Sequence, residues 1–257
     1  MKTIINNYTY ASLVEEGLKR EKHENCWQTS SKEGTSEFTA TESYEEAHDF
    51  AVHGWDLGLK KYEVEDGVLV GGSTLLSPSV AGCLPHVQNY IMGYPQDMFQ
   101  LTDNREYNLP TLDIVVNLAY SAWVDSKDSL AFGKSLVSYI NEMASTRNIR
   151  LTGVFASKQN NGLPVYDFIT LKDFDSALVL NNIAFAFHPS FFRRIWFSVL
   201  EGKEYWSSGY GRTISDYDKV ARERLEGNKS DEVVVFKILN NINKYDWDAK
   251  DLKDVTL

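Results

Sequence analysis

Leu112-Asp113-Ile114-Val115-Val116-Asn117-Leu118-Ala119 is a nearly continuous apolar run, which is typical of a strand buried on both faces. Residues 127–146 follow with apolar positions at helical spacing, and a second apolar run covers Ile149–Ala156. A strand, a helix and another strand in this order form a right-handed βαβ unit with parallel strands. We therefore expect an α/β fold with a mostly parallel central sheet flanked by helices, of the Rossmann-like class.

The residues before this unit contain one clear helix start. Ser43 can cap a helix, and Glu46, three residues later, completes a capping box. Trp55 continues the helical spacing, and Gly54 and Gly58 are expected to end this helix. Residues 67–110 are rich in glycine and proline but also in large apolar side chains, so we expect an irregular, ordered insertion there.

Further elements are expected after the unit. Val165–Leu171 alternates well enough for a third, less buried strand. Asn181–Phe187 and Ser190–Leu200 are expected to be helical, with an interruption at His188-Pro189 because proline lacks an amide proton. Asp231–Leu239 contains consecutive valines that predict another core strand.

We expect a single α/β domain over residues 43–239. Residues 1–42 are polar and weakly periodic, and we interpret them as a polar N-terminal segment. Residues 240–257 are polar and charged, which predicts a C-terminal tail. The length of 257 residues suits one large domain with small appendages.

The net charge of −10 limits the classes of partner. A chain this acidic repels DNA and RNA at long range, so nucleic-acid binding needs a local basic patch. The same charge suits docking onto a basic surface of a partner protein. No apolar run approaches the roughly 20 residues of a membrane span, and residues 1–10 lack the pattern of a secretory signal. We therefore expect a cytoplasmic protein without membrane contact.

Common catalytic and cofactor motifs are missing from the sequence. It contains no Gly-x-x-x-x-Gly-Lys-Ser/Thr, no Gly-x-Gly-x-x-Gly and no Gly-x-Ser-x-Gly. The five histidines show no paired metal-ligand spacing. We therefore expect binding rather than catalysis, and no cofactor.

The end of the first core strand is informative, because ligands of open parallel sheets bind beyond the carboxyl ends of the strands. Here the chain runs Val115-Val116-Asn117-Leu118-Ala119-Tyr120-Ser121, and the second strand ends in Val154-Phe155-Ala156-Ser157. These two stretches, with a long helix between them, resemble a von Willebrand factor A-type domain. The resemblance covers about residues 110–160.

The residues that would bind a metal in such a domain are largely replaced. The family pattern Asp-x-Ser-x-Ser places its acid at Asn117 and its first serine at Ala119, and only Ser121 is kept. An uncharged set of this kind suits Mg²⁺ poorly, so we expect a degenerate A-type domain without a metal. Asp125 would partly compensate for the lost charge. Alternatively, Asn117 and Ser121 cap backbone groups where the strand meets the helix.

His188-Pro189-Ser190 leads into a helix with two consecutive arginines. A helix N-terminus with Arg193 and Arg194 one turn in could clamp a phosphate or a carboxylate. The alternative is that both arginines lie on the solvated side of a helix whose apolar face is buried. His188 is either a hydrogen-bonded structural residue at the helix break or a functional one.

Ser207–Arg212 places an aromatic side chain between glycines and beside an arginine. Proteins that bind single strands combine aromatic stacking with cations, so Tyr210 and Arg212 are candidates for such contacts. The alternative interpretation is a flexible hinge or a hairpin.

Several stretches spread over most of the chain also resemble a family of tailed-phage proteins without an assigned activity. They are Phe38-Thr39-Ala40-Thr41, Glu45-Glu46-Ala47, Gly54-Trp55, Ala81-Gly82, Pro85, Asn89-Tyr90, Gly93, Pro95, Met98, His188-Pro189, Arg193-Arg194 and Phe197. The resemblance implies an intracellular protein made during infection, in the host cytoplasm. It also implies a role like that of the accessory proteins that bring the RNA polymerase of N4-like phages to single-stranded promoter DNA.

We predict a non-catalytic accessory or recruitment protein of a phage that acts through protein contacts. A phage polymerase is the expected protein partner, and single-stranded DNA is a further candidate ligand. The alternative is an enzyme or sensor for a small anionic, nucleotide-like ligand at the carboxyl edge of the sheet. The candidate binding residues are Asn117, Ser121, Asp125, His188, Arg193, Arg194, Tyr210 and Arg212.

Overall fold

The computed structural model describes residues 3–19, 30–55, 58, 68–69, 74–82, 84–85, 87–103, 109–144, 146–176, 178–206, 210–214, 217–225 and 230–236. The predicted C-terminal tail, residues 240–257, lies outside the described residues, as do residues 207–209 of the predicted loop.

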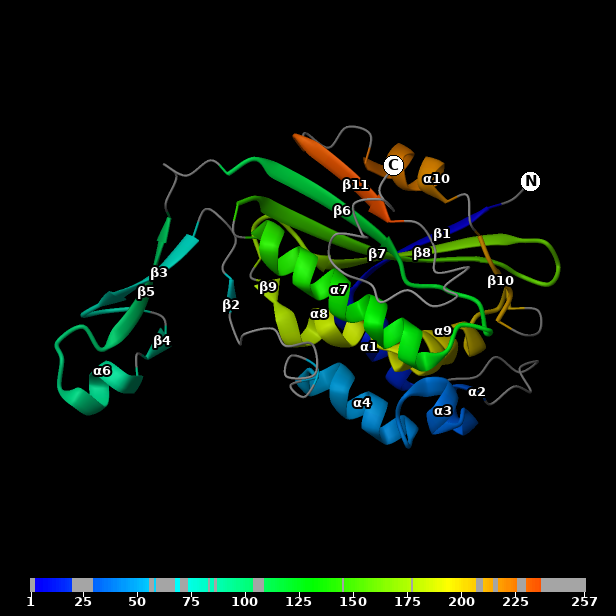
Figure 1. Ribbon diagram of the computed structural model, residues 1–257, viewed down its shortest axis with the longest axis horizontal. Helices are drawn as coiled ribbons and strands as arrows, with labels where there is room; N and C mark the ends of the chain where they lie inside the picture. Colours follow the sequence, from blue (N-terminus) through cyan, green and yellow to red (C-terminus); the bar gives the residue numbers. More distant parts are fainter. Residues whose placement is uncertain are drawn as a thin grey trace.

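A six-stranded sheet forms the centre of the described part of the chain (Figure 1). Its path runs through β1 (Ile4–Thr9), β8 (Pro164–Lys172), β7 (Asn148–Lys158), β6 (Thr111–Asn117) and β11 (Glu232–Phe236), and β10 (Arg212–Thr213) pairs with the end of β7. Strands β7, β6 and β11 are parallel, as are β1 and β8, whereas β7 and β8 are antiparallel. The expected α/β fold with a mostly parallel sheet flanked by helices is confirmed.

The strand–helix–strand unit is present where the sequence predicts it. β6 is buried along nearly its whole length and leads through α7 (Ser126–Ala144) to the parallel strand β7. Asn117, at the end of β6, pairs with Val154 of β7. The apolar side of α7 enters the core through Phe132, Leu136, Val137 and Ile140.

Two parts of the sheet differ from the expectation. β8 contains the strand expected at residues 165–171, and it is well buried because it lies between β1 and β7 rather than at an edge. The residues interpreted as a polar N-terminal segment supply the edge strand β1 and the helix α1 (Tyr10–Lys19), which packs into the core. An edge strand that meets solvent on one face carries a weak apolar pattern, which explains why the sequence did not reveal it.

α4 (Tyr44–His53) begins as the capping box predicts. Ser43 Oγ accepts a hydrogen bond from the amide of Glu46 at 3.1 Å, and the helix stops before Gly54. The Glu46 carboxylate accepts from the amide of Glu42 at 2.6 Å. The first bond satisfies an amide that a helix N-terminus leaves open, whereas the second reaches the residue before Ser43 instead of the amide of Ser43 itself.

Most of the described helices form two layers on one face of the sheet. The inner layer consists of α1, α7, α8 (Leu180–Ala186), η1 (Phe191–Trp196) and α9 (Phe197–Glu201). The short helices α2 (Ser30–Glu33) and α3 (Ser36–Thr39) lie with α4 against η1 and its neighbours. α10 (Asp218–Leu225) packs through Ala221 and Leu225 in a separate core. Within the described ranges, no helix is both long and apolar enough to cross a membrane.

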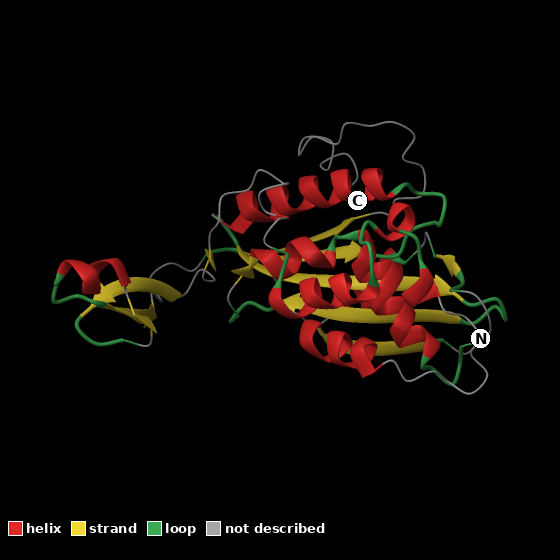
Figure 2. Ribbon diagram, turned by 90° about the horizontal axis from the view of Figure 1, so that it is seen from below, coloured by secondary structure: helices red, strands yellow, loops and turns green. Residues whose placement is uncertain are grey.

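The described part of the insertion at residues 67–110 forms a small unit of its own. β3 (Thr74–Ser79) and β4 (Leu84–Pro85) pair with β5 (Met98–Asp103), and α6 (Val87–Met92) lies beside β5. The unit stands apart from the main body in both views (Figures 1 and 2). β2 (Val68–Leu69) pairs with β9 (Leu178–Val179).

Candidate functional site

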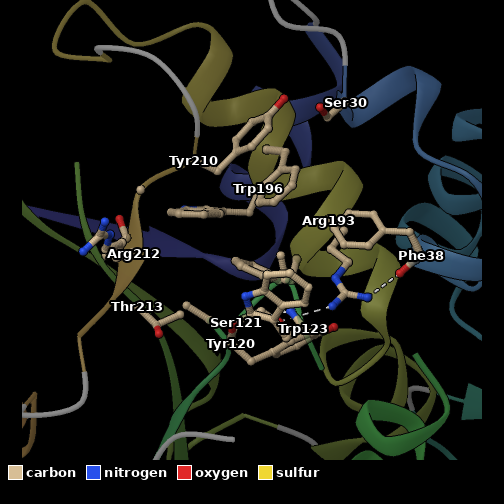
Figure 3. A pocket seen from close by; sticks show the side chains of 16 residues that line it. Ser30, Phe38, Tyr120, Ser121, Trp123, Arg193, Trp196, Tyr210, Arg212 and Thr213 are labelled. Carbon is tan, nitrogen blue, oxygen red and sulfur yellow. Dashed lines mark hydrogen bonds between the residues drawn. The ribbon is translucent and has the colours of Figure 1, made fainter. Parts of the chain in front are cut away.

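A cavity of about 770 Å³ opens at the carboxyl edge of β6 and β7 (Figure 3). β6 pairs with β7 only as far as Asn117, whereas β7 continues to Lys158 and pairs there with Arg212 of β10. The cavity is lined by residues on both sides of this divergence, including Ser121 after β6 and Ser157 near the end of β7. This is the edge at which parallel sheets commonly bind ligands.

Aromatic side chains form a large part of the cavity wall. Seven of them line it: Phe38, Tyr120, Trp123, Phe192, Trp196, Phe197 and Tyr210. Three come from the continuous helix formed by η1 and α9, whose first part is a π-helix. Such widened helical turns occur frequently at functional sites.

Trp196 is anchored by a buried carboxylate. Its indole Nε1 donates to Asp167 Oδ2 at 2.7 Å, and Asn6 Nδ2 donates to Asp167 Oδ1 at 2.6 Å. Burial raises the pKa of Asp167 above its usual value, while the two hydrogen bonds act in the opposite direction. The position of the Trp196 ring is therefore tied to the sheet through β8.

Tyr210 lies on the same side of the cavity, against Phe197, and is equally constrained. Its ring stacks on Phe197 with centroids 3.6 Å apart, and its hydroxyl donates to Glu201 Oε1 at 2.6 Å. Burial is the main reason that the pKa of Tyr210 lies above its usual value, so the hydroxyl stays protonated. Glu201 also accepts from the amide and the hydroxyl of Ser31. The carboxylate thus joins the segment of Tyr210 to α2.

Gly211 allows Tyr210 and Arg212 to take their places. It adopts a φ of +79°, and a Cβ atom there would lie 2.6 Å from the carbonyl oxygen of Lys158. Only glycine combines this conformation with so close an approach. Arg212 opposes Lys158 across the antiparallel pair, and Arg212 itself lines the cavity.

Arg193 enters the cavity wall from η1 and is almost fully buried. Its guanidinium donates to the carbonyl oxygen of Val124 at 2.6 Å, more weakly to that of Ser121, and to that of Phe38. The guanidinium carbon lies 3.9 Å from the ring centroid of Phe38 and 4.8 Å from that of Tyr120. Burial lowers the pKa of Arg193, but an arginine remains charged at neutral pH.

Arg194 points away from the cavity, although it is the next residue. It makes five hydrogen bonds, to Thr41 Oγ1 and to the carbonyl oxygens of Ser31, Lys32, Gly34 and Thr41. The prediction that both arginines lie on a solvated helix side is wrong, because the α2–α4 region covers them. Arg194 cannot join Arg193 in clamping one anion, since its donors hold the backbone of α2 and its surroundings.

The other predicted residues separate into different environments. Asn117 is buried outside the large cavity, beside one of only about 10 Å³, and its Oδ1 accepts from the amide of Ala119 at 2.9 Å. His188 lies beside the same small cavity, and its Nδ1 accepts from the amide of Ser190. Asp125 accepts from the amide of Lys127 at the start of α7. These contacts fit the capping and structural alternatives.

A second hollow of about 280 Å³ adjoins the cavity. It shares Phe38, Trp123 and Arg193 with the cavity, but Glu37 and Asp125 add carboxylates. The described lining of the large cavity contains no carboxylate, histidine, cysteine or lysine. The large cavity therefore suits an anionic ligand, whereas the second hollow disfavours phosphate.

The structure brings together four of the predicted site residues, namely Ser121, Arg193, Tyr210 and Arg212 (Figure 3). Sequence reasoning missed Phe38, Trp123, Trp196 and Phe197 as parts of the same wall. Trp123 exposes 96% of its surface to solvent, and the neighbouring residues in the sequence do not predict this exposure. The abundance of aromatic residues was a signal, but their meeting depends on the helix η1–α9 crossing the end of the sheet.

A family model described as "Domain of unknown function (DUF7192)" matches residues 5–256, so the chain belongs to this family. Comparison with curated proteins and with solved structures gave no match.

Proposed function

We propose that this member of the DUF7192 family is a binding protein whose cavity takes a planar, negatively charged ligand of the nucleotide class. The observation that supports this is the composition of the wall, with seven aromatic side chains, the exposed Arg212 and no carboxylate among the described lining residues. Aromatic rings stack on nucleobases, and arginine pairs with phosphate.

The wall supports binding rather than chemistry. General acid–base catalysis needs a side chain that exchanges a proton near the operating pH. The described lining offers arginines, hydroxyl groups and phenols, and the best-placed phenol, Tyr210, is held protonated by burial and bonded to Glu201. The serines that line the cavity therefore lack a base beside them in the described lining.

The charge of the whole chain favours a small ligand over a long strand. At a net charge of −10 the protein repels a polynucleotide along its length, whereas a mononucleotide carries few charges. A strand that continued into the second hollow would bring phosphates near Glu37 and Asp125. Free nucleotides and the nucleotides of a single strand nevertheless share the recognised chemistry, so the test must separate them.

The test is titration of the protein with each of the four nucleoside monophosphates and with a ten-residue oligothymidylate. We expect saturable binding of at least one monophosphate, and a loss of affinity of about 10-fold in Arg212→Ala because the phosphate loses its partner. Arg222→Ala is the matched control, because Arg222 is also exposed but lies on α10. Absence of any binding to the wild-type protein contradicts the proposal, and tight binding of the oligonucleotide alone assigns the cavity to single strands.

A second candidate function is the recruitment of a partner protein, which is the role predicted from the sequence. It is favoured by exposed apolar side chains on the small unit that stands apart from the body, namely Val80, Tyr90, Ile91, Met92 and Tyr94. Residues 74–103 contain no lysine or arginine, and interface centres are typically depleted in charge and rich in aromatic residues and methionine. A phage polymerase as that partner stays a prediction.

Recruitment is tested by affinity capture from cells that contain the natural partners. A partner recovered with the wild-type protein should be lost with Ile91→Ser combined with Tyr94→Ser. Retention of that partner by the double variant would exclude the small unit as the contact surface.

A further inference from the structure

Trp123 is the most exposed of the large apolar side chains in the described chain, at 96% of its surface. It nevertheless lines the large cavity, where Figure 3 shows it, and it also lines the adjoining hollow. Burying an indole ring is favourable in free energy because it removes a large apolar surface from water. An indole that stays in solvent at the mouth of a cavity is therefore available to a ligand.

The backbone beneath Trp123 is fixed, in contrast to its side chain. The carbonyl of Ser121 accepts from the amide of Val124 at 3.0 Å, which closes a tight turn with Trp123 inside it. Ser121 Oγ also accepts a weak hydrogen bond from the amide of Trp123 at 3.4 Å. The turn is therefore defined by its own hydrogen bonds.

Arg193 holds this turn from the inside. Its Nη2 donates to the carbonyl oxygen of Val124 at 2.6 Å and approaches that of Ser121 at 3.5 Å, at the two ends of the turn. The guanidinium is itself packed on Phe38 and Tyr120, and 1% of Arg193 is exposed. A buried arginine thus presents an exposed indole at a fixed place above the cavity.

The opposite wall is rigid down to its side chains. Tyr210 is stacked on Phe197 and bonded to Glu201, and Trp196 is bonded to Asp167. One wall is therefore preorganised, and the other carries an aromatic ring with no packing over it. Preorganised contacts reduce the entropy lost on binding, and a single free ring adds contact only when a ligand arrives.

We infer that Trp123 is a stacking residue that closes over the planar ring of a bound nucleotide and selects ligands that have such a ring. The inference rests on the proposed function, since it assigns the base, rather than the phosphate, to the Trp123 side of the cavity. Arg193 acts as a positioning residue, because it reaches the ligand only through the turn that it holds.

The test compares adenosine 5′-monophosphate, or whichever of the four monophosphates binds the wild-type protein best, with ribose 5-phosphate, which carries the same anion without a base. Trp123→Ala should weaken binding of the monophosphate by about 5-fold to about 150-fold, the range that alanine substitution at stacking aromatics produces. Trp123→Phe should recover part of that loss. Binding of ribose 5-phosphate should be the same in all three proteins.

Two controls separate binding from folding. Tyr90→Ala removes another exposed aromatic side chain, on the small unit, and should leave monophosphate binding unchanged. The melting temperature of Trp123→Ala without ligand should equal that of the wild type, because the indole makes little contact with the folded chain. Subtracting the tryptophan fluorescence of Trp123→Phe from that of the wild type gives the emission of Trp123. Iodide should quench this emission less when the monophosphate is bound.

Wild-type affinity of Trp123→Ala for the monophosphate would overturn the inference and leave the proposed function standing. Equal losses for the monophosphate and for ribose 5-phosphate would also overturn it, since they would show a general distortion of the site. If none of the four monophosphates binds the wild-type protein, the proposed function and this inference fail together.

Discussion

The two sides of the helix η1–α9 present different kinds of side chain. Toward α2–α4, Arg194 and Glu201 bond to backbone and side-chain groups of α2 and its surroundings. Toward the sheet edge, the same helix presents Phe192, Trp196 and Phe197 to an open cavity. Burial and charge alone therefore do not mark a binding site, because both buried arginines hold backbone carbonyl groups and only Arg193 also borders the cavity.

The largest effect is expected from removing the anchor on the outer side. Arg194→Met leaves several buried carbonyl groups without donors and should lower the free energy of unfolding by about 3–5 kcal/mol. Chemical denaturation measures this change. Arg194→Lys keeps the charge but loses the forked donors, so its loss in the free energy of unfolding should be intermediate. An unchanged free energy of unfolding in Arg194→Met would refute the structural role of Arg194.

Arg193 offers the corresponding test on the cavity side. Arg193→Met removes the donor to Val124 and loosens the turn that carries Trp123. We expect a smaller loss of about 1–3 kcal/mol in the free energy of unfolding, because fewer carbonyl groups are left open. Unlike Arg194→Met, it should also weaken monophosphate binding when measured well below the unfolding transition. Equal stability losses in the two variants would remove the distinction between the sides.

Tyr210 on the cavity side and Glu201 on the side of α2 are joined by one hydrogen bond, so the two sides of the helix are coupled there. Tyr210→Phe keeps the stack on Phe197 but removes one donor to the Glu201 carboxylate. The expected loss in the free energy of unfolding is about 1–2 kcal/mol, in the range of hydrogen bonds to charged groups. Chemical denaturation of the double variant Glu201→Gln/Tyr210→Phe checks this pairing. Its loss in the free energy of unfolding should be smaller than the sum of the losses in the two single variants, as expected for residues in contact.

The smallest effect concerns Asp167 behind Trp196 and appears as a pH dependence. Because burial raises the pKa of Asp167, the folded state holds its proton at pH values where the unfolded state has released it. Stability from this group is therefore greatest at low pH and declines as the pH rises from the unfolded value through the raised folded value. Asp167→Asn should lack this decline when unfolding curves are compared across that range. Parallel pH profiles of the two proteins would contradict it.

The strand–helix–strand unit could be read from the sequence because its signals are local. The apolar run of β6 and the stripe of α7 depend only on neighbouring residues, as does the capping of α4 by Ser43. The edge strand β1 could not be read in this way, since its residues alternate between half-buried and exposed positions and carry only a weak apolar pattern.

The candidate site was only partly predictable. Tyr210 and Arg212 stood out because glycines flank the aromatic residue, and Ser121 stood out at the end of a strand. The roles of Arg193 and Arg194 could not be separated, since adjacent helical residues face different directions and only the packing of α2–α4 shows which direction is closed.

The α/β class, the central βαβ unit and the start of α4 follow from local sequence, because periodicity and capping are properties of short segments. The folded molecule alone shows that aromatic side chains from α3, the β6–α7 turn, η1–α9 and the segment before β10 share one cavity. A cavity is made by surfaces from distant segments, and its shape follows from how the whole core packs.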